Sequence, residues 1–327
     1  MFVPVTFATA LVMMIASTVC WGSWANTFKV TRNYRFELFY WDYSIGVVLI
    51  SVLCAFTMGA TQPGPLSFVN NLHSASWSNI LCAGFGGFIF NIANVLLVAG
   101  IDIAGLAIAF PLSIGIALVE GVLLSYMIQP KGQLGLLLGG VVMALAAVVL
   151  IGRAYGSMNA SGRTTSKKGI RICVISGLLM GAFAPFNTRA LTAAHPLTPY
   201  GIVVCFAIGA FICCFVFNTW LMRRPLSGTP VRFSEYFRVG ASQHALGLLG
   251  GVIWGVGIVF NMVAANLVGV SISYAIGQAS PMIAALWGLL VWHEFRGADR
   301  RARLYLAGMF CCYAVALVLV SEAYHFS

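Results

Sequence analysis

The chain has 327 residues, of which 60% are hydrophobic and 8% are charged, and its formal net charge at pH 7 is +10. Soluble domains have roughly 25% charged residues, so this composition excludes an ordinary soluble protein and indicates one that lies in a lipid bilayer. The positive charge does not indicate a nucleic-acid-binding protein, because the basic residues lie in short loops between apolar segments and not on a folded polar face.

Ten apolar stretches are long enough to cross a bilayer, for which a helix needs about 20 residues. None shows the residue alternation of a strand in a membrane barrel. The sequence therefore predicts an all-α integral membrane protein with ten transmembrane helices. Their approximate ranges are 4–28, 40–61, 77–99, 103–128, 133–152, 170–190, 199–222, 241–263, 268–292 and 303–323.

The lysines and arginines predict the orientation, because membrane proteins retain these residues in short cytoplasmic loops. With the N terminus outside, 16 of the 18 basic residues fall on the cytoplasmic side, and only Lys131 and Arg189 fall outside. We therefore expect both termini outside. The cytoplasmic set is Lys29, Arg32, Arg35, Arg153, Arg163, Lys167, Lys168, Arg171, Arg223, Arg224, Arg232, Arg238, Arg296, Arg300, Arg301 and Arg303.

A short pattern occurs twice at a constant spacing of 170 residues, since Phe90-Asn91 and Pro111 return as Phe260-Asn261 and Pro281. Weak similarity between two halves is typical of membrane transporters. Five helices in each half is an odd number, so the second copy is inserted upside down, and we expect an inverted five-plus-five repeat. The expected parts are a first repeat over 1–152, a cytoplasmic linker over 153–169 that is rich in Ser, Thr, Gly and basic residues, and a second repeat over 170–327.

Several neutral polar side chains lie inside the expected third, eighth and ninth helices: Asn91, Asn94, Asn261, Tyr274 and Gln278. Each one alone is well explained as a hydrogen-bonding bridge between helices. Their presence on helices related by the repeat favours a binding site. They suit a neutral solute, because no Arg or Lys lies at mid-membrane depth to pair with an anion.

Trp21 and Trp254 offer flat apolar surfaces on which a sugar or a planar heterocycle can stack. Pro111, Pro185 and Pro281 lie within expected helices, where proline kinks or breaks the backbone. Such breaks serve as hinges or expose carbonyl groups to a cavity in transporters. The alternative is a tolerated kink, and the repeat favours the hinge role for Pro111 and Pro281.

Charged residues suggest two further roles. Glu120 lies deep in the fourth apolar stretch, and intramembrane acids usually face a cavity or a packed interior. It is therefore the candidate proton carrier, the alternative being a hydrated or helix-paired carboxylate. Asp42 and Arg35 lie at the cytoplasmic mouth of the second helix and are candidates for a cytoplasmic gate. Ordinary solvated loop charges, worth ~0 to 1 kcal/mol per pair, are the more common explanation of such residues.

No cofactor or metal is expected. The nine cysteines all lie in apolar stretches without the spacing of a metal site or a disulfide framework, and the five histidines form no ligand pattern. An intramembrane enzyme would need a clustered nucleophile and base, and no pair of His, Asp or Glu at membrane depth shares a helix at four-residue spacing. We therefore expect a non-enzyme.

A family resemblance is carried by Gly22-Ser23-Trp24, the basic loop to Arg35, Asp42-Tyr43, the segment 84–91 and Gly105-Leu106. In these motifs the chain resembles the ureide permease branch of the drug/metabolite transporter superfamily, and the neighbouring glucose, ribose and rhamnose uptake proteins. The resemblance implies proton-driven uptake of a small neutral solute, in plants ureides and oxopyrimidines such as allantoin and uracil. The short linker has no nucleotide-binding motif, so nucleotide regulation is not implied.

The sequence therefore predicts a secondary active transporter of the cytoplasmic (inner) membrane, with a site between its halves for a ureide, a nucleobase or a similar heterocycle. Its expected partners are this solute, protons and the bilayer. The alternatives are a metabolite or drug exporter of the same superfamily and a sugar importer. Composition leaves the oligomeric state open, because lipid-facing and partner-facing apolar surfaces look alike.

Overall fold

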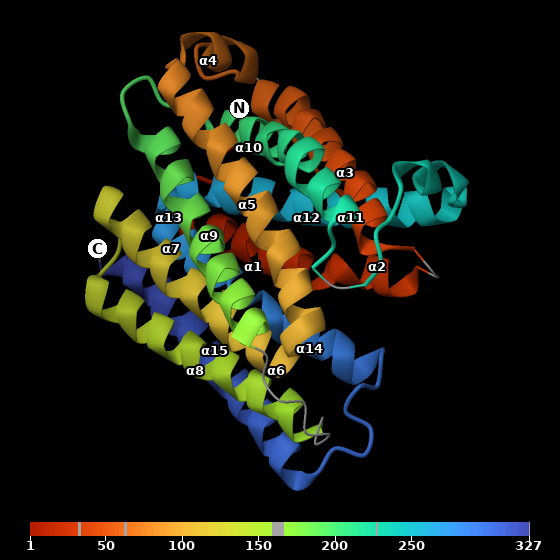
Figure 1. Ribbon diagram of the computed structural model, residues 1–327. Coiled ribbons are helices and arrows are strands. Elements are labelled where there is room, and N and C mark those ends of the chain that lie inside the picture. The colour runs from red at the N-terminus through yellow and green to blue at the C-terminus, as the bar shows by residue number, and fades with distance from the viewer. Residues whose placement is uncertain (32–33, 62–63, 159–166, 227, 327) are drawn as a thin grey trace.

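The computed structural model describes residues 1–31, 34–61, 64–158, 167–226 and 228–326, and the described part is helical without strands (Figure 1). The predicted linker therefore falls partly outside the described residues, as do Arg32 and Arg163. The longer helices are α1 (Phe7–Ser23), α3 (Phe36–Thr57), α5 (Trp77–Ala104), α7 (Gly115–Ile128), α8 (Leu134–Met158), α9 (Lys167–Thr192), α10 (Pro199–Cys213), α12 (Ala241–Val268) and α15 (Arg300–His325).

Shorter elements join or extend these helices. The α-helical ones are α2 (Ala25–Val30), α4 (Phe68–Ser74), α6 (Leu106–Ala109), α11 (Thr219–Arg223), α13 (Val270–Gly277) and α14 (Ser280–Leu290). The others are η1 (Met58–Ala60), η2 (Phe110–Ile114), η3 (Cys214–Asn218) and η4 (Phe233–Arg238), of which η2 and η3 are π-helical turns within longer helices.

Nine helices of the described part are long and apolar enough to cross a membrane, against the ten predicted. The difference lies in the stretch 268–292, which is divided into α13 and α14 by Gln278 and Ala279. Pro281 lies at the start of α14, where the missing N–H of proline breaks no helical hydrogen bond. The apolar pattern thus predicted one continuous helix where the chain forms two short ones.

Helices α5 and α12 are the two long central helices, and they are alike in length and in their ends. Each has 28 residues and stops at a glycine with a positive φ, 79° at Gly105 and 88° at Gly269. Helix α5 packs against α9 and α10, whereas α12 packs against α1 and α3. Helices α8 and α15 pack along each other at the edge of the molecule (Figure 1).

Glycines bring α5 against α10 and α12 against α3 at backbone distance. A Cβ on Gly87 would lie 1.9 Å from the carbonyl oxygen of Phe206, and one on Gly251 would lie 1.9 Å from that of Tyr43. Farther along the same interfaces, a Cβ on Gly209 would lie 1.9 Å from the oxygen of Gly84, and one on Gly46 would lie 2.3 Å from that of Leu248. These close contacts leave no room for larger side chains.

Corresponding residues in the two glycine-lined interfaces are 163 or 164 positions apart in the sequence. The predicted repeat has a spacing of 170 residues, whereas Gly87 and Gly251, like Gly105 and Gly269 at the helix ends, are 164 positions apart.

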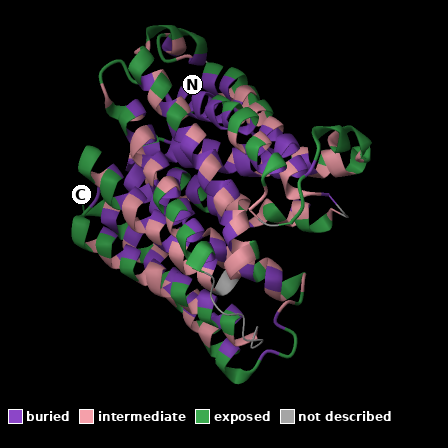
Figure 2. Ribbon diagram, in the orientation of Figure 1, coloured by how far each residue is buried: buried purple, intermediate pink, exposed green. Residues whose placement is uncertain are grey.

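Buried residues follow the inner faces of the helices, and exposed ones cover the outer surface (Figure 2). Many exposed side chains are large and apolar, including Val12, Leu49, Leu53, Met127 and Phe215. In water such a surface would be unfavourable, whereas lipid chains solvate it. The burial pattern therefore fits helices that are surrounded by a bilayer.

Candidate functional site

A cavity of about 220 Å³ lies among α1, α2, α5, α9, α12 and the break between α13 and α14. Its walls are mainly aromatic and aliphatic, with a few polar side chains. Small-molecule sites usually combine an apolar wall with a small number of placed polar groups. The lining includes Trp21, Trp24, Phe28, Phe36, Phe90, Asn94, Leu97, Val98, Ile101, Met180, Phe183, Trp254, Gln278, Ser280 and Pro281.

The cavity continues toward the end of the molecule that carries the basic loops. Phe28, Phe36 and Val98 line it and also line a second hollow of about 460 Å³. The wall of that hollow is mainly apolar and also includes the charged residues Arg35, Glu37 and Asp102. A solute could therefore reach the aromatic cavity from this end.

Trp254 forms the inner wall of the cavity and is only 5% exposed. Its ring stacks at 6.0 Å from the ring of Trp21 and at 6.0 Å from that of Phe206, and it lies 4.7 Å from the ring of Phe90. These residues come from α1, α5, α10 and α12, so both halves of the chain build this wall. Such packed rings form a rigid surface against which a planar solute can stack.

Trp21 is held in a slot between two glycines. A Cβ on Gly257 would lie 2.6 Å from Cδ1 of Trp21, and one on Gly277 would lie 2.5 Å from its Cζ3. The indole Nε1 is buried and has no hydrogen-bond partner in the described part of the chain. A buried donor without a partner is costly, so this N–H is suited to a carbonyl oxygen of a bound solute.

Asn94 and Gln278 bring amide groups to the cavity. Asn94 donates a hydrogen bond of 3.0 Å from Nδ2 to the Tyr40 hydroxyl, which fixes its orientation. Gln278 is 7% exposed and lies at the break between α13 and α14. Helix ends carry backbone groups without helical partners, so the break adds polar groups beside this side chain.

Three other predicted binding residues lie outside the cavity lining. Asn261 donates from Nδ2 to the carbonyl oxygen of Ser273 at 2.8 Å, which joins α12 to α13. The hydroxyl of Tyr274 is buried and donates to the carbonyl oxygens of Ala117 and Met180, at 3.3 and 3.4 Å. Asn91 accepts a 3.7 Å contact from the Cys214 thiol, and its Nδ2 has no partner in the described residues.

Glu120 also lies outside the cavity lining, at the contact between α7 and α9. A Cβ on Gly181 would lie 2.8 Å from its Oε2, and this oxygen is buried without a partner in the described part of the chain. Of the three predicted hinge prolines, Pro111 lies in the π-helical turn η2 and Pro185 lies inside α9. Only Pro281 lines the cavity.

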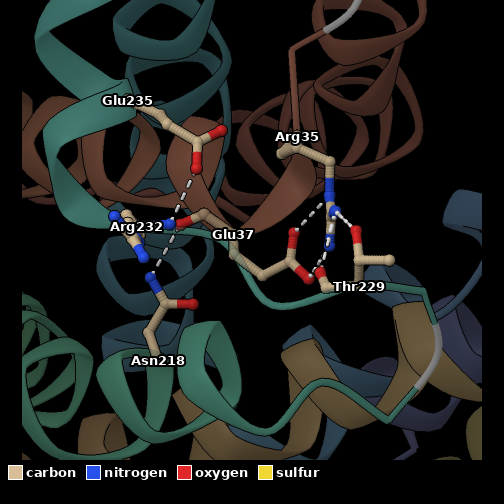
Figure 3. A network of polar contacts seen from close by, with 6 residues as sticks. All are labelled: Arg35, Glu37, Asn218, Thr229, Arg232 and Glu235. Carbon is tan, nitrogen blue, oxygen red and sulfur yellow. Dashed lines mark hydrogen bonds and ion pairs between the residues drawn. The ribbon is translucent and has the colours of Figure 1, made fainter.

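Arg35 and Asp42, the predicted gate residues, have separate partners. The Arg35 guanidinium pairs with Glu37 at 2.9 Å and donates to the carbonyl oxygen of Thr229 at 3.0 Å (Figure 3). Close by, the amide of Asn218 donates to the Glu37 carbonyl oxygen at 2.9 Å, which joins α3 to η3. Figure 3 shows that these contacts tie the start of α3 to the loop after α11.

Asp42 lies in a buried polar cluster with Tyr34, Tyr236 and His244. Its Oδ2 accepts a 2.5 Å hydrogen bond from Tyr34 and lies 2.8 Å from His244 Nδ1, while its Oδ1 accepts a hydrogen bond from Tyr236. Burial, and then the hydrogen bond to Asp42, raise the pKa of both tyrosines, so they remain donors. Sequence reasoning missed this cluster because its members are up to 210 residues apart. Asp42 within an apolar run was its signal in the sequence.

A second polar group joins α1 and α2 to the region around α14. Glu294 accepts hydrogen bonds from Lys29 and, at 3.1 Å, from the Tyr155 hydroxyl. The indole N–H groups of Trp287 and Trp292 donate to Ser23 and Asn26, at 2.8 and 2.6 Å. These contacts hold the cavity wall formed by α1 against that formed by α14.

Comparison with known proteins gives a consistent family match. The model of the ureide permease family matches residues 39–171 and 160–323. Ureide permease 1 of Arabidopsis thaliana is 21% identical over 381 aligned positions, covering 97% of each chain. Ureide permease 2 of the same plant is 22% identical and covers 96% of this chain and 97% of its own.

The fold also has a match among solved structures. One crystal structure of a protein superposes on this chain with a TM-score of 0.66, at 16% identity, covering 96% of this chain and 98% of the other. At this identity the likeness concerns the fold alone. It extends over nearly the full length of both chains, so the helical arrangement described above is one that a second protein adopts.

Proposed function

Because this chain belongs to the ureide permease family, we propose that it carries a ureide or a similar small neutral heterocycle across the cytoplasmic membrane through the central cavity. Membership of this family, together with nine apolar helices in the described residues, makes the chain a multi-pass membrane transporter and not an enzyme. The family match does not favour the exporter or the sugar importer that the sequence left open.

The observation that carries the proposal is the composition of the cavity wall. Aromatic rings face it from Trp21 and Trp254, and amide groups face it from Asn94 and Gln278. A ureide or an oxopyrimidine has a flat, uncharged body with several carbonyl and N–H groups, which stacking rings and amides can bind together. In the proposal, Trp21 and Trp254 stack on the solute, and Asn94 and Gln278 form hydrogen bonds to it.

The remaining predicted binding residues have a supporting part in this proposal. Asn261 and Tyr274 lie behind the lining and join α13 to neighbouring helices. We propose that these two residues hold the broken helix in position while the lining residues bind the solute. Asn91 on α5 contacts Cys214 of η3, and we propose that it supports the packing of these two elements.

We propose alternating access between two inverted five-helix units, 1–152 and 170–327. The support is that α5 packs against α9 and α10 as α12 packs against α1 and α3, with equivalent glycine contacts. The two short helices α13 and α14 together would then cross the membrane once and bring the number of spanning elements in the described part of the chain from nine to ten. Pro111 lies in the π-helical turn η2 and Pro281 lies at the start of α14, beside the break, which suits a hinge role, whereas Pro185 lies within a continuous helix.

With both termini outside, the basic loops face the cytoplasm, and the cavity is open toward that side. The proposed state is therefore an inward-open one. Uptake requires a second state that opens outward, and the ionic contacts of Lys29 and Arg35 are ones that would change between the two states. An inward proton gradient is the proposed energy source, and Glu120 is one candidate carrier.

The experiment is uptake by proteoliposomes of labelled uracil and allantoin beside glucose and rhamnose, with and without an inward proton gradient. We expect saturable uptake of the heterocycles that the gradient stimulates. Uptake of the sugars alone would contradict the proposed solute class, and an absence of uptake for all four compounds would contradict import. Empty liposomes and the Trp254→Ala variant provide the background.

A further inference from the structure

Three polar side chains meet around the buried carboxylate of Asp42, away from the cavity lining, and together with Asp42 they come from four separate segments. Tyr34 precedes α3, Asp42 lies in α3, Tyr236 lies in η4 and His244 lies in the first turn of α12. The Asp42 side chain is 3% exposed and that of His244 is 23% exposed. The imidazole therefore lies between the buried carboxylate and the solvent.

The charge of this cluster depends on one proton. With a protonated imidazole, the 2.8 Å contact between His244 Nδ1 and Asp42 Oδ2 is a neutral ion pair. With a neutral imidazole, Nδ1–H can still donate to Asp42, but the carboxylate then keeps a net negative charge that the described residues stabilise with neutral donors, among them the hydroxyls of Tyr34 and Tyr236. Burying a charge without an opposite charge is strongly unfavourable, and histidine is the side chain that commonly changes its charge between pH 5 and 8.

The other charged groups near the cluster are already paired or point to solvent. Arg35 binds Glu37 and Thr229, and Glu235 accepts a hydrogen bond from the backbone N–H of Arg232. Arg238 lies with Tyr34 in the wall of an open hollow of about 710 Å³. Tyr34 itself is 5% exposed, so the proton would enter and leave the cluster through the more exposed imidazole of His244.

The same turn of α3 connects Asp42 to the cavity. Two residues before Asp42, the Tyr40 hydroxyl accepts the hydrogen bond from Asn94. The ring of the next residue, Tyr43, lies 4.8 Å from that of Trp24 and 6.3 Å from that of Trp254. All three partners line the cavity.

Helix α12 makes a second connection. A Cβ on Gly247 would lie 2.5 Å from Cβ of Asp42, and one on Gly251 would lie 1.9 Å from the Tyr43 carbonyl oxygen. His244 and Trp254 belong to this same helix. A movement of α12 against α3 at His244 would therefore be carried along the helix to the Trp254 wall.

We infer that Asp42 and His244 form a proton-binding site whose occupancy controls the shape of the solute cavity. The protonated pair holds α12 against α3 and keeps Trp254 and Tyr43 in the arrangement described above. Loss of the proton weakens this contact, and the wall rearranges. This inference rests on the proposed function for its solute, and it places the coupling proton at the cytoplasmic end of α3, away from Glu120.

The test uses the full-length protein in five forms: wild type, His244→Gln, Tyr236→Phe, Glu120→Gln and His73→Gln. Gln keeps a hydrogen-bonding side chain at position 244 without a titrating group. His73 in α4 takes no part in the cluster and is the matched histidine control. Tyr236→Phe removes one hydrogen-bond donor to Asp42. It provides a second test of the cluster if His244→Gln does not fold.

The first readout needs no transport. Tryptophan fluorescence of the purified protein is followed between pH 5 and 8, because Trp24 and Trp254 contact Tyr43. We expect a sigmoidal change in the wild type, His73→Gln and Glu120→Gln, no such change in His244→Gln, and a shifted midpoint in Tyr236→Phe. An unchanged curve in His244→Gln, or a flat curve in the wild type, would overturn the proton site.

The second readout separates coupling from transport. Counterflow of uracil or allantoin without a proton gradient tests the proposed function, and gradient-driven accumulation tests the coupling. We expect His244→Gln to lose accumulation while its counterflow continues, and His73→Gln to keep both. Accumulation that persists in His244→Gln would overturn the inference, whereas absent wild-type counterflow would contradict the proposed function and leave the fluorescence result to decide on the proton site.

Discussion

The indole rings of Trp21 and Trp254 stack with their centroids 6.0 Å apart and their planes at 20°, although one belongs to the first helix and the other to α12. Both rings face the cavity, and neither can move without changing its wall. Because α1 packs directly against α12, the stack joins the two halves of the chain at the proposed solute site. Relative movement of the halves would therefore alter the surface that the solute contacts.

The glycine slot around Trp21 gives the first prediction. A methyl group at Gly257 would lie 2.6 Å from the indole ring, so Gly257→Ala should push Trp21 toward the cavity. We expect weaker solute binding, by roughly 1–3 kcal/mol as for overpacked cores. The smaller ring in the double variant Gly257→Ala/Trp21→Phe should recover part of the affinity relative to Gly257→Ala.

The measurement is the Kd of the solute in detergent. Gly240→Ala is the control, because a Cβ at Gly240 meets nothing within 4 Å. Equal affinities of wild type and Gly257→Ala would show that Trp21 does not contact the solute.

The equivalent glycine contacts give the second prediction. Gly87→Ala and Gly251→Ala each place a Cβ 1.9 Å from a carbonyl oxygen, so the paired helices must separate. We expect both variants to lower the thermal unfolding temperature, with a cost of roughly 1–3 kcal/mol each or more. Gly84→Ala should have a smaller effect, since its Cβ would meet the Cys205 oxygen at an ordinary 3.6 Å. A wild-type unfolding temperature in both variants would contradict the close packing.

The sequence predicted much of this architecture because the bilayer imposes a simple pattern on it. Long apolar runs with basic loops predicted nine of the spans in the described residues, whereas the break at Gln278, which divides the remaining one, was not predicted. Apolar residues around this position gave no sign that the backbone is interrupted. The proline at position 281 was noticed, but proline is tolerated both at the start of a helix and as a kink within one.

The site was harder to predict than the helices. Trp21, Asn94, Trp254 and Gln278 line the cavity, whereas Asn261 and Tyr274 bind helix neighbours. Residue type and depth do not say which face of a helix a side chain occupies when nearly every face is apolar. The partners of Asp42 were beyond prediction for a similar reason, since a single sequence contains no signal that links His244 to a residue 202 positions earlier.

Lys29 and Glu294 give the third prediction. Their side chains are 41% and 30% exposed, so solvent screens the pair, and such pairs contribute about 0–1 kcal/mol to stability. Lys29→Met should therefore change the unfolding temperature little. The Tyr155 hydroxyl would still donate to Glu294 at 3.1 Å.

A conformational role for the pair of Lys29 and Glu294 would appear in the transport rate and not in the unfolding temperature. If the contact favours one state of the transporter, Lys29→Met should change the rate of solute counterflow while the unfolding temperature stays near that of the wild type. Arg35→Gln, which removes the other exposed ion pair, is the matched comparison. A large loss of stability in Lys29→Met would instead mean that the pair is part of the folded core.

The final prediction compares two amides that the sequence placed in the same class. Gln278 lines the cavity, whereas both amide atoms of Asn261 are bound to Ser273, at 2.8 and 3.3 Å. Gln278→Ala should therefore weaken solute binding by up to about tenfold, the loss of a hydrogen bond worth roughly 0.5–1.5 kcal/mol. Its unfolding temperature should change little, because the Gln278 side chain makes no hydrogen bond to another helix within the described part of the chain, and the backbone break remains. Asn261→Ala should lower the unfolding temperature, since it leaves the buried carbonyl oxygen of Ser273 without its donor. Solute Kd and unfolding temperature, measured on both variants, separate the roles: a reversed pattern would move the binding site toward the interface of α12 and α13.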